Sequence, residues 1–539
     1  MKYADQLTRS DQALAHKLAD FVPDEIYDIH THPYHPDHFA PGTWKFLDGK
    51  GPIGCAEHRA ALQRYMPSQT IHGLYFGMPN KAADHPAINT WVADQVKQHG
   101  TPLSRGLMLV TPNDDRDSVA QALRSGLFCG IKVYHCYSGR PDTMNASVEE
   151  YAPDWMWEIL HEVHGVMLLH IVRDGAMEDE TNQQSIRRLC RSYPKAQLIL
   201  AHIGRSFNYR NARNGFHRLV DLDNVVVDTS AICESEAFAA ALKFLGPRRV
   251  LWGSDFAVSE MRGRCVSTGK SFFWLHPELL SADYVAPTTT DFPLVGIESL
   301  LCLREACEDA GLTSGDIGDI FCDNALRTLA PHLPSGTIAP NPTGPELWQR
   351  AQSVISCGTG LLSKRAESFD AQGWPSYFSR ASGCEVWDLN GRRYIDFAGG
   401  CGAILLGYAD PQVNAAVRRR VSLGTYSTLL NPQEIELAEQ LIDLHPWADK
   451  VRYARGGGDA MMVAVRIARA ATGKSGVAFC GYHGWHDWYL AANLGEGDAL
   501  DGHLLPGLEP HGVPRELKGT AVPFHYNNLE SLDAAIAQL

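Results

Sequence analysis

The feature that most constrains this chain is an alternation of apolar, strand-like runs with amphipathic helical segments across residues 26–255. The runs are almost continuously apolar, as strands of a parallel sheet with both faces covered must be. Eight strands are expected, at residues 26–32, 71–78, 104–110, 130–137, 166–172, 197–203, 225–230 and 249–255. Eight strands in strict alternation with helices predict a (β/α)8 barrel, whose active site lies at the carboxyl ends of its strands.

Polar side chains gather at those carboxyl ends. The first run ends in His30 and His32, which project to the same side of a strand because they are two residues apart. Neutral imidazole is a good ligand for zinc and similar transition metals. The later runs end in Lys132, His135, His170, His202, Asp228 and Asp255. A hydrogen-bonded structural role is the alternative for any one of them alone, but their recurrence at strand ends favours a metal site.

The composition limits the classes of function. A chain of 539 residues with 45% hydrophobic and 20% charged residues can bury large cores and predicts two or more domains. The net charge of −14 argues against a nucleic-acid or anionic-membrane partner, and no apolar run is long enough to cross a bilayer. The 13 cysteines form no Cys-x-x-Cys pair and are odd in number, which favours a reduced, cytoplasmic protein.

Six motifs within residues 26–330 resemble the amidohydrolase superfamily, in its branch of metal-dependent hydrolases and nonoxidative decarboxylases. They are Asp28-Ile-His-Thr-His32, Gly130-Ile-Lys132, Leu168-Leu-His170, Leu200-Ala-His-Ile-Gly204, Trp252-Gly-Ser-Asp-Phe256 and Ile320-Phe-Cys-Asp-Asn-Ala325. The resemblance implies a first domain at residues 1–330 that holds one divalent cation, most often zinc. The implied ligands are His30, His32, His170 and Asp255, with His202 beside them as a catalytic acid or base.

The chemistry of such a cation leaves two reactions open. It lowers the pKa of bound water, so that hydroxide is available near neutral pH. Asp255 can accept the proton and pass it to a leaving group, while His202 polarises a carbonyl or stabilises an oxyanion. We therefore expect hydrolysis of an amide, ester or lactone bond in a small metabolite. A site of this kind acting on a substrate carboxylate can instead release CO2.

Three basic residues are candidates for substrate binding. Lys132 and His135 lie at the end of the fourth run, and Arg205 lies just past the sixth. A structural role is an equal alternative for Lys132 and His135, and a solvated arginine is the alternative for Arg205. The resemblance does not imply the carboxylated lysine of two-metal relatives, so Lys132 is expected to contact substrate or to pack.

Residues 331–345 mark a domain boundary because they hold five prolines in fifteen positions, which predicts a stiff extended linker. We place the linker at residues 331–352 and a second domain at residues 353–539. That domain is expected to contain a hairpin at 385–397, helices at 411–420 and 432–444, and a strand, glycine loop and helix across 451–469. Backbone amides of such a loop suit a phosphate, although tight turns share the pattern.

From about residue 358 the chain resembles class III aminotransferases and glutamate-1-semialdehyde aminomutases, which use pyridoxal phosphate on the fold-type-I scaffold. The motifs include Gly407-Tyr-Ala-Asp-Pro411, Gly456-Gly-Gly-Asp-Ala460 and Gly481-Tyr-His-Gly484. The implied cofactor-binding residues are Gly457, Gly458, Asp459, Tyr482 and His483. The glycines would bind the phosphate, and Tyr482 would stack on the pyridine ring with His483 beside it.

Two departures from this second family limit what is expected of the chain. The family usually has a hydroxyl residue where Gly458 stands. Its Schiff-base lysine normally lies well beyond the Tyr-His-Gly motif, and Lys518 has no matching context in residues 485–539. We expect that the chain alone cannot complete a transamination, and that it is a fragment of a longer fusion in preference to a noncatalytic remnant.

Three functions therefore stay open on small-molecule substrates. The first is a metal-dependent hydrolase joined to an aminotransferase or aminomutase, and the second makes the barrel a decarboxylase or lyase. The third makes the second half a dimerisation module. A homodimer is implied by the second resemblance, because fold-type-I enzymes are dimers.

Overall fold

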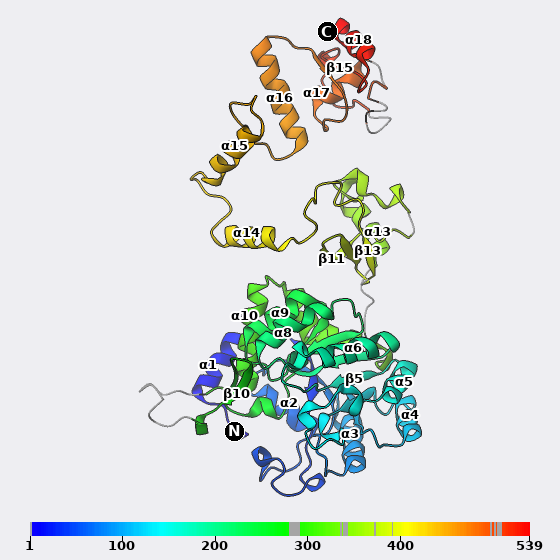
Figure 1. Cartoon of the computed structure of the whole chain (residues 1–539), viewed down its shortest axis with the longest axis vertical. Helices are drawn as coiled ribbons and strands as arrows, with labels where there is room; N and C mark the ends of the chain where they lie inside the picture. The colour runs from blue at the N-terminus through cyan, green and yellow to red at the C-terminus, as the bar shows by residue number, and fades with distance from the viewer. Residues whose placement is uncertain are drawn as a thin grey trace. The chain divides into compact units, whose positions relative to one another are not determined.

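The computed structural model describes residues 3–279, 292–334, 337, 343–370, 373–390, 392–495, 498–500, 503 and 509–539. The chain divides into two compact units (Figure 1). The first unit comprises Met1–Arg380 and Glu385–Ile395, and the second comprises Ala381–Cys384 and Asp396–Leu539.

The first unit contains the predicted eight-stranded parallel barrel. Its strands are β1 Glu25–Thr31, β2 Thr70–Tyr75, β3 Arg105–Leu109, β4 Gly130–Val133, β5 Val166–Leu169, β6 Gln197–Leu200, β7 Val225–Asp228 and β8 Val250–Leu251. Neighbours in the sheet follow the order of the sequence from β1 to β8. Each adjacent pair in this series is parallel. The prediction of a (β/α)8 barrel is confirmed.

Helices cover the outside of the barrel strands (Figure 1). They are α1 Arg9–Leu18, α2 Cys55–Gln63, α3 His85–His99, α4 Arg116–Arg124, α5 Asp154–Val163, α6 Glu180–Ser192, α8 Tyr209–Gly215, α9 Ser235–Leu245 and α10 Val295–Asp309. Several begin at an aspartate that caps a backbone amide; the Asp84 side chain, for example, accepts from Ala87 N at the start of α3. The alternation of strands with helices predicted across residues 26–255 is thus present, whereas α2 and α10 were not predicted from the sequence.

Alternate residues of each strand join different buried clusters. Met167 and Leu169 of β5 pack in the cluster between sheet and helices, whereas Val166 and Leu168 belong to a second cluster with Leu329 of α12 Asn324–Leu329. This two-residue period explains why the strands read as continuous apolar runs, since both faces are buried.

Several strands end earlier than their apolar runs predict. The runs extend to residues 137, 172 and 203, but β4, β5 and β6 end at Val133, Leu169 and Leu200. After β6 the chain turns, with left-handed backbone at His202, Ile203 and Gly204. The polar residues at the strand ends therefore lie in turns just beyond the ladder.

Further elements follow the eighth strand. They are the antiparallel pair β9 Arg264–Thr268 and β10 Ser271–Leu275, then α11 Ser314–Gly318, α12 and α13 Gly344–Val354. Helix α13 occupies the last part of the segment predicted as linker, so that part is helical. Residues 335–336 and 338–342 of the predicted linker lie outside the described residues. The predicted hairpin is confirmed by the antiparallel pairing of β12 Glu385–Asp388 with β13 Arg393–Ile395, although Gly391 of its turn is outside the described residues.

The second unit holds the remaining elements. They are α14 Pro411–Ser422, α15 Gln433–Leu444, α16 Gly457–Thr472, β14 Val477–Phe479, α17 Asp487–Leu490, β15 Ala521–Pro523 and α18 Leu529–Gln538. Strand β14 pairs in parallel with β15, and Phe479 packs there with Val465, Trp488 and Tyr489. The strand expected at residues 451–454 is wrong, because these residues have no regular structure. An apolar run forms a strand only where a partner strand supplies hydrogen bonds.

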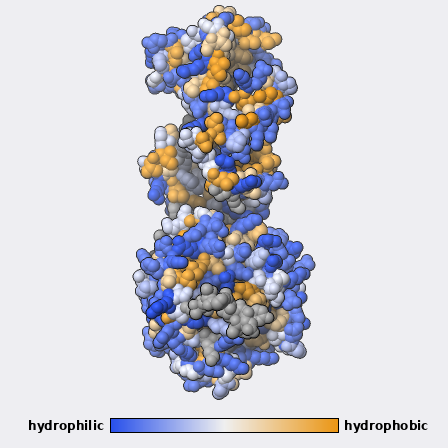
Figure 2. Space-filling model, turned by 90° about the vertical axis from the view of Figure 1, so that its left-hand side faces the viewer, coloured by the Kyte–Doolittle hydropathy of each residue, from blue (hydrophilic) through white to orange (hydrophobic). Residues whose placement is uncertain are grey.

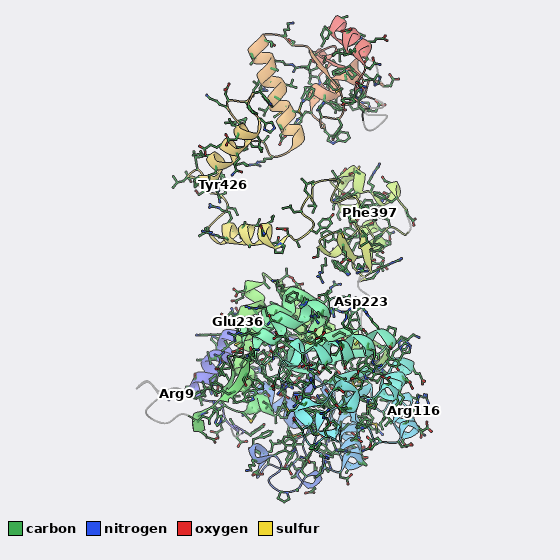
Figure 3. All side chains as sticks on the ribbon, in the orientation of Figure 1. Arg9, Arg116, Asp223, Glu236, Phe397 and Tyr426 are labelled. Carbon is green, nitrogen blue, oxygen red and sulfur yellow. The ribbon has the colours of Figure 1, made fainter. Side chains whose placement is uncertain are left out.

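Large apolar side chains of the second unit are exposed. Phe397 is 97% and Tyr426 95% accessible, and both are labelled in Figure 3. Figure 2 shows hydrophobic side chains gathered in patches on the face that it presents. Within the described part of the chain, no helix has the length and apolar character that a membrane span requires.

Candidate active site at the carboxyl end of the barrel

Three candidate ligands converge at the end of β1. The Nε2 atoms of His30 and His32 lie 3.2 Å apart. Asp255 Oδ1 is 3.5 Å from the first of these atoms and 3.7 Å from the second. All three side chains are buried, and one ligand atom from each falls within 4.8 Å of the others. The pairing of the two histidines that β1 predicts is therefore present.

The other ring nitrogen of each histidine is committed to an acceptor. His30 Nδ1 donates to Asp228 Oδ2 at 2.8 Å, and His32 Nδ1 to the Gly77 carbonyl at 3.3 Å. Burial holds the pKa of both imidazoles well below the usual value, so both rings are neutral. Their Nε2 lone pairs consequently face each other, an arrangement that is favourable only with a cation or proton between them. The donor set fits a zinc-type ion.

Asp228 and Ser230 hold His30 and His202 in place by hydrogen bonds. Asp228 Oδ1 accepts from His202 N at 2.8 Å and from Ser230 Oγ at 2.5 Å. The Ser230 hydroxyl also lies 3.1 Å from His30 Nδ1. Hydrogen bonds of this kind fix the tautomer and orientation of metal-ligating histidines. Asp228, which ends β7, was predicted only as one of the polar residues at strand ends, and the role of Ser230, two residues later, was not predicted.

His202 is held as a neutral imidazole. Its Nδ1 donates to the Ser230 carbonyl at 2.9 Å and lies 4.0 Å from Asp255 Oδ2. Burial lowers the pKa of His202 to about 4. Burial, followed by the neighbouring charge of Asp228, raises the pKa of Asp255 to about 7. A carboxyl with that pKa can take up and release a proton near neutrality.

His170 is buried close to this group but outside its convergent atoms. Its ring centroid lies 5.0 Å from that of His202 and 4.7 Å from that of Tyr134. Neither of the two convergent groups found among the described residues, His30–His32–Asp255 and His30–His202–Asp228, contains His170. Its assignment as a ligand stays a prediction.

Lys132 is a buried amine with no hydrogen-bond partner among the described residues. Its Nζ lies 5.1 Å from the centroid of the Phe76 ring and 5.8 Å from that of Tyr134. Burial lowers the pKa of Lys132 to about 7, against the opposing charges of Asp228 and Asp255. An unsatisfied buried amine beside the candidate metal site is available to an anionic group.

Two more predicted substrate contacts lie at the mouth of the barrel. His135 Nδ1 lies 3.0 Å from Thr143 Oγ1, and its ring centroid is 6.0 Å from that of His170. Arg205 donates to the Arg173 carbonyl at 3.3 Å, and its guanidinium lies 5.5 Å from the Phe272 ring centroid of β10. Aromatic side chains that were not predicted as part of the site also lie here: Phe207 packs between His202 and Phe272.

In the second unit, the predicted cofactor residues cluster around the start of α16. Gly457 and Gly458 open this helix; an added Cβ at Gly457 would meet nothing within 4 Å, whereas one at Gly458 would lie 3.5 Å from the His486 ring. Gly458 approaches Gly484, whose φ is +99° and whose Cβ would lie 2.9 Å from Gly458 Cα. A helix start with open glycines fits a phosphate.

The remaining predicted cofactor residues lie near that helix start. Asp459 Oδ1 is 3.3 Å from His486 Nε2. Tyr482 is 38% exposed, and its ring makes T-shaped contacts with Trp485 and Tyr489, each at 5.9 Å between centroids. His483 Nε2 donates to the Cys480 carbonyl at 2.8 Å.

Comparisons with known proteins match both halves. Residues 370–496 match the aminotransferase class-III family. Glutamate-1-semialdehyde 2,1-aminomutase of Albidiferax ferrireducens is 38% identical over 194 residues, which are 35% of this chain and 43% of that protein. An omega-transaminase from Sphaerobacter thermophilus is 28% identical with a TM-score of 0.32, covering 37% of this chain and 45% of the other. The chain spans less than half the length of the curated relatives it matches.

The first half has its own relatives. Amidohydrolase 2 from Bifidobacterium longum subsp. infantis is 14% identical with a TM-score of 0.35, and the match covers 57% of this chain and 99% of that one. Residues 27–330 match the amidohydrolase family, which is more than half of the 539 residues. The protein therefore belongs to the amidohydrolase family and carries a class-III aminotransferase region in the same chain.

Proposed function

We propose that the barrel is a metal-dependent hydrolase of small anionic metabolites, acting on an amide, ester or lactone bond. The observation that carries this proposal is the pair of neutral imidazoles whose Nε2 atoms face each other at 3.2 Å beside the Asp255 carboxylate. His30, His32 and Asp255 would hold the ion, with His170 as the fourth ligand implied by the resemblance. The bound cation, most often zinc in this branch, supplies an activated water.

The protein residues around it have separate roles in this proposal. Asp255 accepts the proton of the attacking water and returns it to the leaving group, as its raised pKa allows. His202, whose Nδ1–H is donated to the Ser230 carbonyl, presents an unprotonated Nε2 that can accept a hydrogen bond or a proton in the site. Lys132 and Arg205 bind a substrate carboxylate, because one is unpaired and the other makes a single long hydrogen bond.

The alternative is nonoxidative decarboxylation at the same site. The observation that favours it is the enclosure of Lys132 Nζ between the rings of Phe76 and Tyr134. A substrate carboxylate bound there would be stripped of water, which can promote loss of CO2. Release of CO2 from candidate carboxylates separates the two reactions.

Metal content tests both versions. Elemental analysis of the full chain, purified without chelator, is expected to find one divalent ion per chain. His170→Ala is expected to empty the site, whereas His217→Ala, which changes an exposed histidine, should keep the ion. An ion-free wild type would contradict the proposal, and an ion retained in His170→Ala would remove that residue from the ligands.

We further propose that the second unit contributes a pyridoxal-phosphate site, with the phosphate on Gly457 and Gly458, the ring against Tyr482, and Asp459 and His483 beside it. The cofactor would supply aminotransferase or aminomutase chemistry when the Schiff-base lysine is present. The test is binding of pyridoxal phosphate to the full chain by equilibrium dialysis together with quenching of its tryptophan fluorescence, both of which Gly458→Val should abolish by filling the helix start. Quenching that survives Gly458→Val would contradict this assignment.

A homodimer through the second unit is also proposed. Leu405 and Leu430, like Phe397 and Tyr426, are at least 87% exposed, and so much open apolar surface is typical of an interface. Sedimentation should give twice the chain mass of 59.4 kDa. Leu430→Glu should return the chain mass, and an unchanged dimer would argue against this surface.

A further inference from the structure

The seam between β8 and β1 is the least regular part of the barrel. Strand β8 has two residues, and beyond it the contacts with β1 are separate hydrogen bonds from Ile29 N to Trp252 O at 3.1 Å, from Asp255 N to His30 O at 3.0 Å and from His32 N to Phe256 O at 2.8 Å. Asp255 itself has a φ of +57°. A regular ladder therefore does not set the direction of this candidate metal ligand.

The Asp28 carboxylate spans the seam. Its Oδ1 accepts from Ser254 N at 2.9 Å and from His30 N at 3.2 Å. Its Oδ2 accepts from Ser254 Oγ at 2.5 Å. Asp28 is fully buried, so these bonds are made without competition from water. One carboxylate thus ties the backbone of His30 to the residue that precedes Asp255.

A histidine from outside the strands completes this arrangement. His58 of α2 donates from Nε2 to Asp28 Oδ2 at 2.9 Å. Its Nδ1 lies 3.1 Å from the Tyr75 hydroxyl. Burial raises the pKa of Tyr75 well above its usual value, so the phenol keeps its proton and donates to Nδ1. That bond fixes the tautomer in which His58 presents an N–H to Asp28.

We propose that His58 is a positioning residue for the metal site: through Asp28 and Ser254 it sets the direction of the Asp255 carboxylate toward the ion held by His30 and His32. This inference rests on the proposed metal-dependent function. Removal of the N–H from His58 leaves Oδ2 of a buried carboxylate with one donor fewer, so Ser254 and the adjoining Asp255 lose a fixed anchor.

Co²⁺ binding to the full chain tests the proposal, because the visible absorption of the ion reports its ligand geometry without any substrate. His58→Gln keeps an N–H near the position of Nε2, and His58→Met of similar volume removes it. We expect His58→Gln to bind within about threefold of wild type and His58→Met to bind about 10–100-fold more weakly with an altered absorption band.

His72 provides the matched control. It is also a buried histidine paired with a carboxylate, 2.8 Å from Glu25 Oε1, but it lies toward the amino-terminal end of β2. His72→Gln and His72→Met should bind Co²⁺ equally. If His72→Met weakens Co²⁺ binding as much as His58→Met does, the loss reflects general stability, and the positioning role of His58 is overturned.

The Co²⁺ measurements distinguish failure of the positioning role of His58 from failure of the metal-dependent function. Equal binding by His58→Met and His58→Gln overturns the inference while leaving the metal-dependent function intact. A wild type that binds no Co²⁺ overturns that function and the inference with it. If His58→Met yields no folded protein, Ser254→Ala, which removes one hydroxyl, takes its place; binding as tight as wild type would overturn the proposal.

Discussion

Two helices of nearly equal length show how differently the two units use their apolar residues. Helix α9 in the barrel buries Phe238, Leu242 and Leu245, whereas α15 in the second unit has no buried residue. Yet α15 carries Ile435 and Leu437, 64% and 48% exposed, among a comparable set of apolar positions. Both helices carry apolar residues suited to burial, but among the described residues only α9 packs them against other elements. The apolar face of the barrel helix is therefore packed within its own unit, and that of α15 is not.

The largest expected effect tests this difference directly. Phe238→Ala should lower the free energy of unfolding of the barrel by about 3–5 kcal/mol, because it leaves a cavity in a fully buried position. Ile435→Ala should change the free energy of unfolding of the second unit by about 0.5 kcal/mol or less. Urea unfolding followed by circular dichroism measures both. A large loss in Ile435→Ala would mean that α15 is packed in solution, which would break the comparison.

The same difference explains what could be predicted from the sequence. The eight strands were predictable because burial of both faces makes each strand a continuous apolar run. Their ends were not, because the turn at His202 depends on a bond from its amide to Asp228 on the next strand. The strand predicted at residues 451–454 did not form, because a short run of this kind does not show whether a partner strand lies beside it.

The candidate site divides in the same way. His30 and His32 could be paired from their spacing on one strand, and Asp255 from its place at the end of another. The contacts of Ser230 with His30 and of His58 with Asp28 could not be predicted. Their partners are 200 and 30 residues apart, and a hydrogen bond over such a distance leaves no periodic pattern in the sequence.

The second prediction concerns the buried carboxylate of Asp228 and the hydrogen bonds that it accepts in the barrel. Asp228→Asn should destabilise the barrel by about 3 kcal/mol, since Asp228 accepts from His30, Ser230 and the His202 amide in a site closed to water. It should also weaken Zn²⁺ binding, because His30 loses its fixed tautomer. Urea unfolding and chelator competition give the two quantities. A variant as stable as wild type would show that the hydrogen bonds accepted by Asp228 contribute little to the stability of the barrel.

The third prediction is a substitution that should stabilise the barrel. Lys132→Met should raise the free energy of unfolding by about 1–3 kcal/mol, because it replaces an unpaired buried amine with an apolar side chain. The folded-state pKa of Lys132 is about 7 and the unfolded value about 10.4, so the gain is full below pH 7 and fades as the pH rises toward 10.4. Lys243→Met, at an exposed position of α9, is the control and should be neutral. A loss of stability in Lys132→Met would mean that the amine has a partner in solution.

The fourth prediction is the pH dependence of Zn²⁺ affinity. Asp255 has a pKa of about 7 and must lose its proton to bind, whereas His30 and His32 are already neutral. Below pH 7 the affinity should therefore fall about tenfold, or ~1.4 kcal/mol, for each pH unit. Calorimetric titration at several pH values measures the slope. A slope near three protons would mean that the histidines are also charged, and a flat profile would exclude Asp255 as a ligand.

The smallest effect is expected at the corresponding His–Asp pair of the second unit. Asp459 and His486 lie 3.3 Å apart, with side chains 49% and 33% exposed. Water screens this pair, so Asp459→Asn should change the free energy of unfolding by about 0.5 kcal/mol or less, against about 3 kcal/mol for Asp228→Asn. Urea unfolding at low and high salt checks it, with His511→Ala at an exposed position as the control. A salt-insensitive loss of several kcal/mol would show that this helix start is covered in solution, and the second unit would then be as closed around its glycine loop as the barrel is around its histidines.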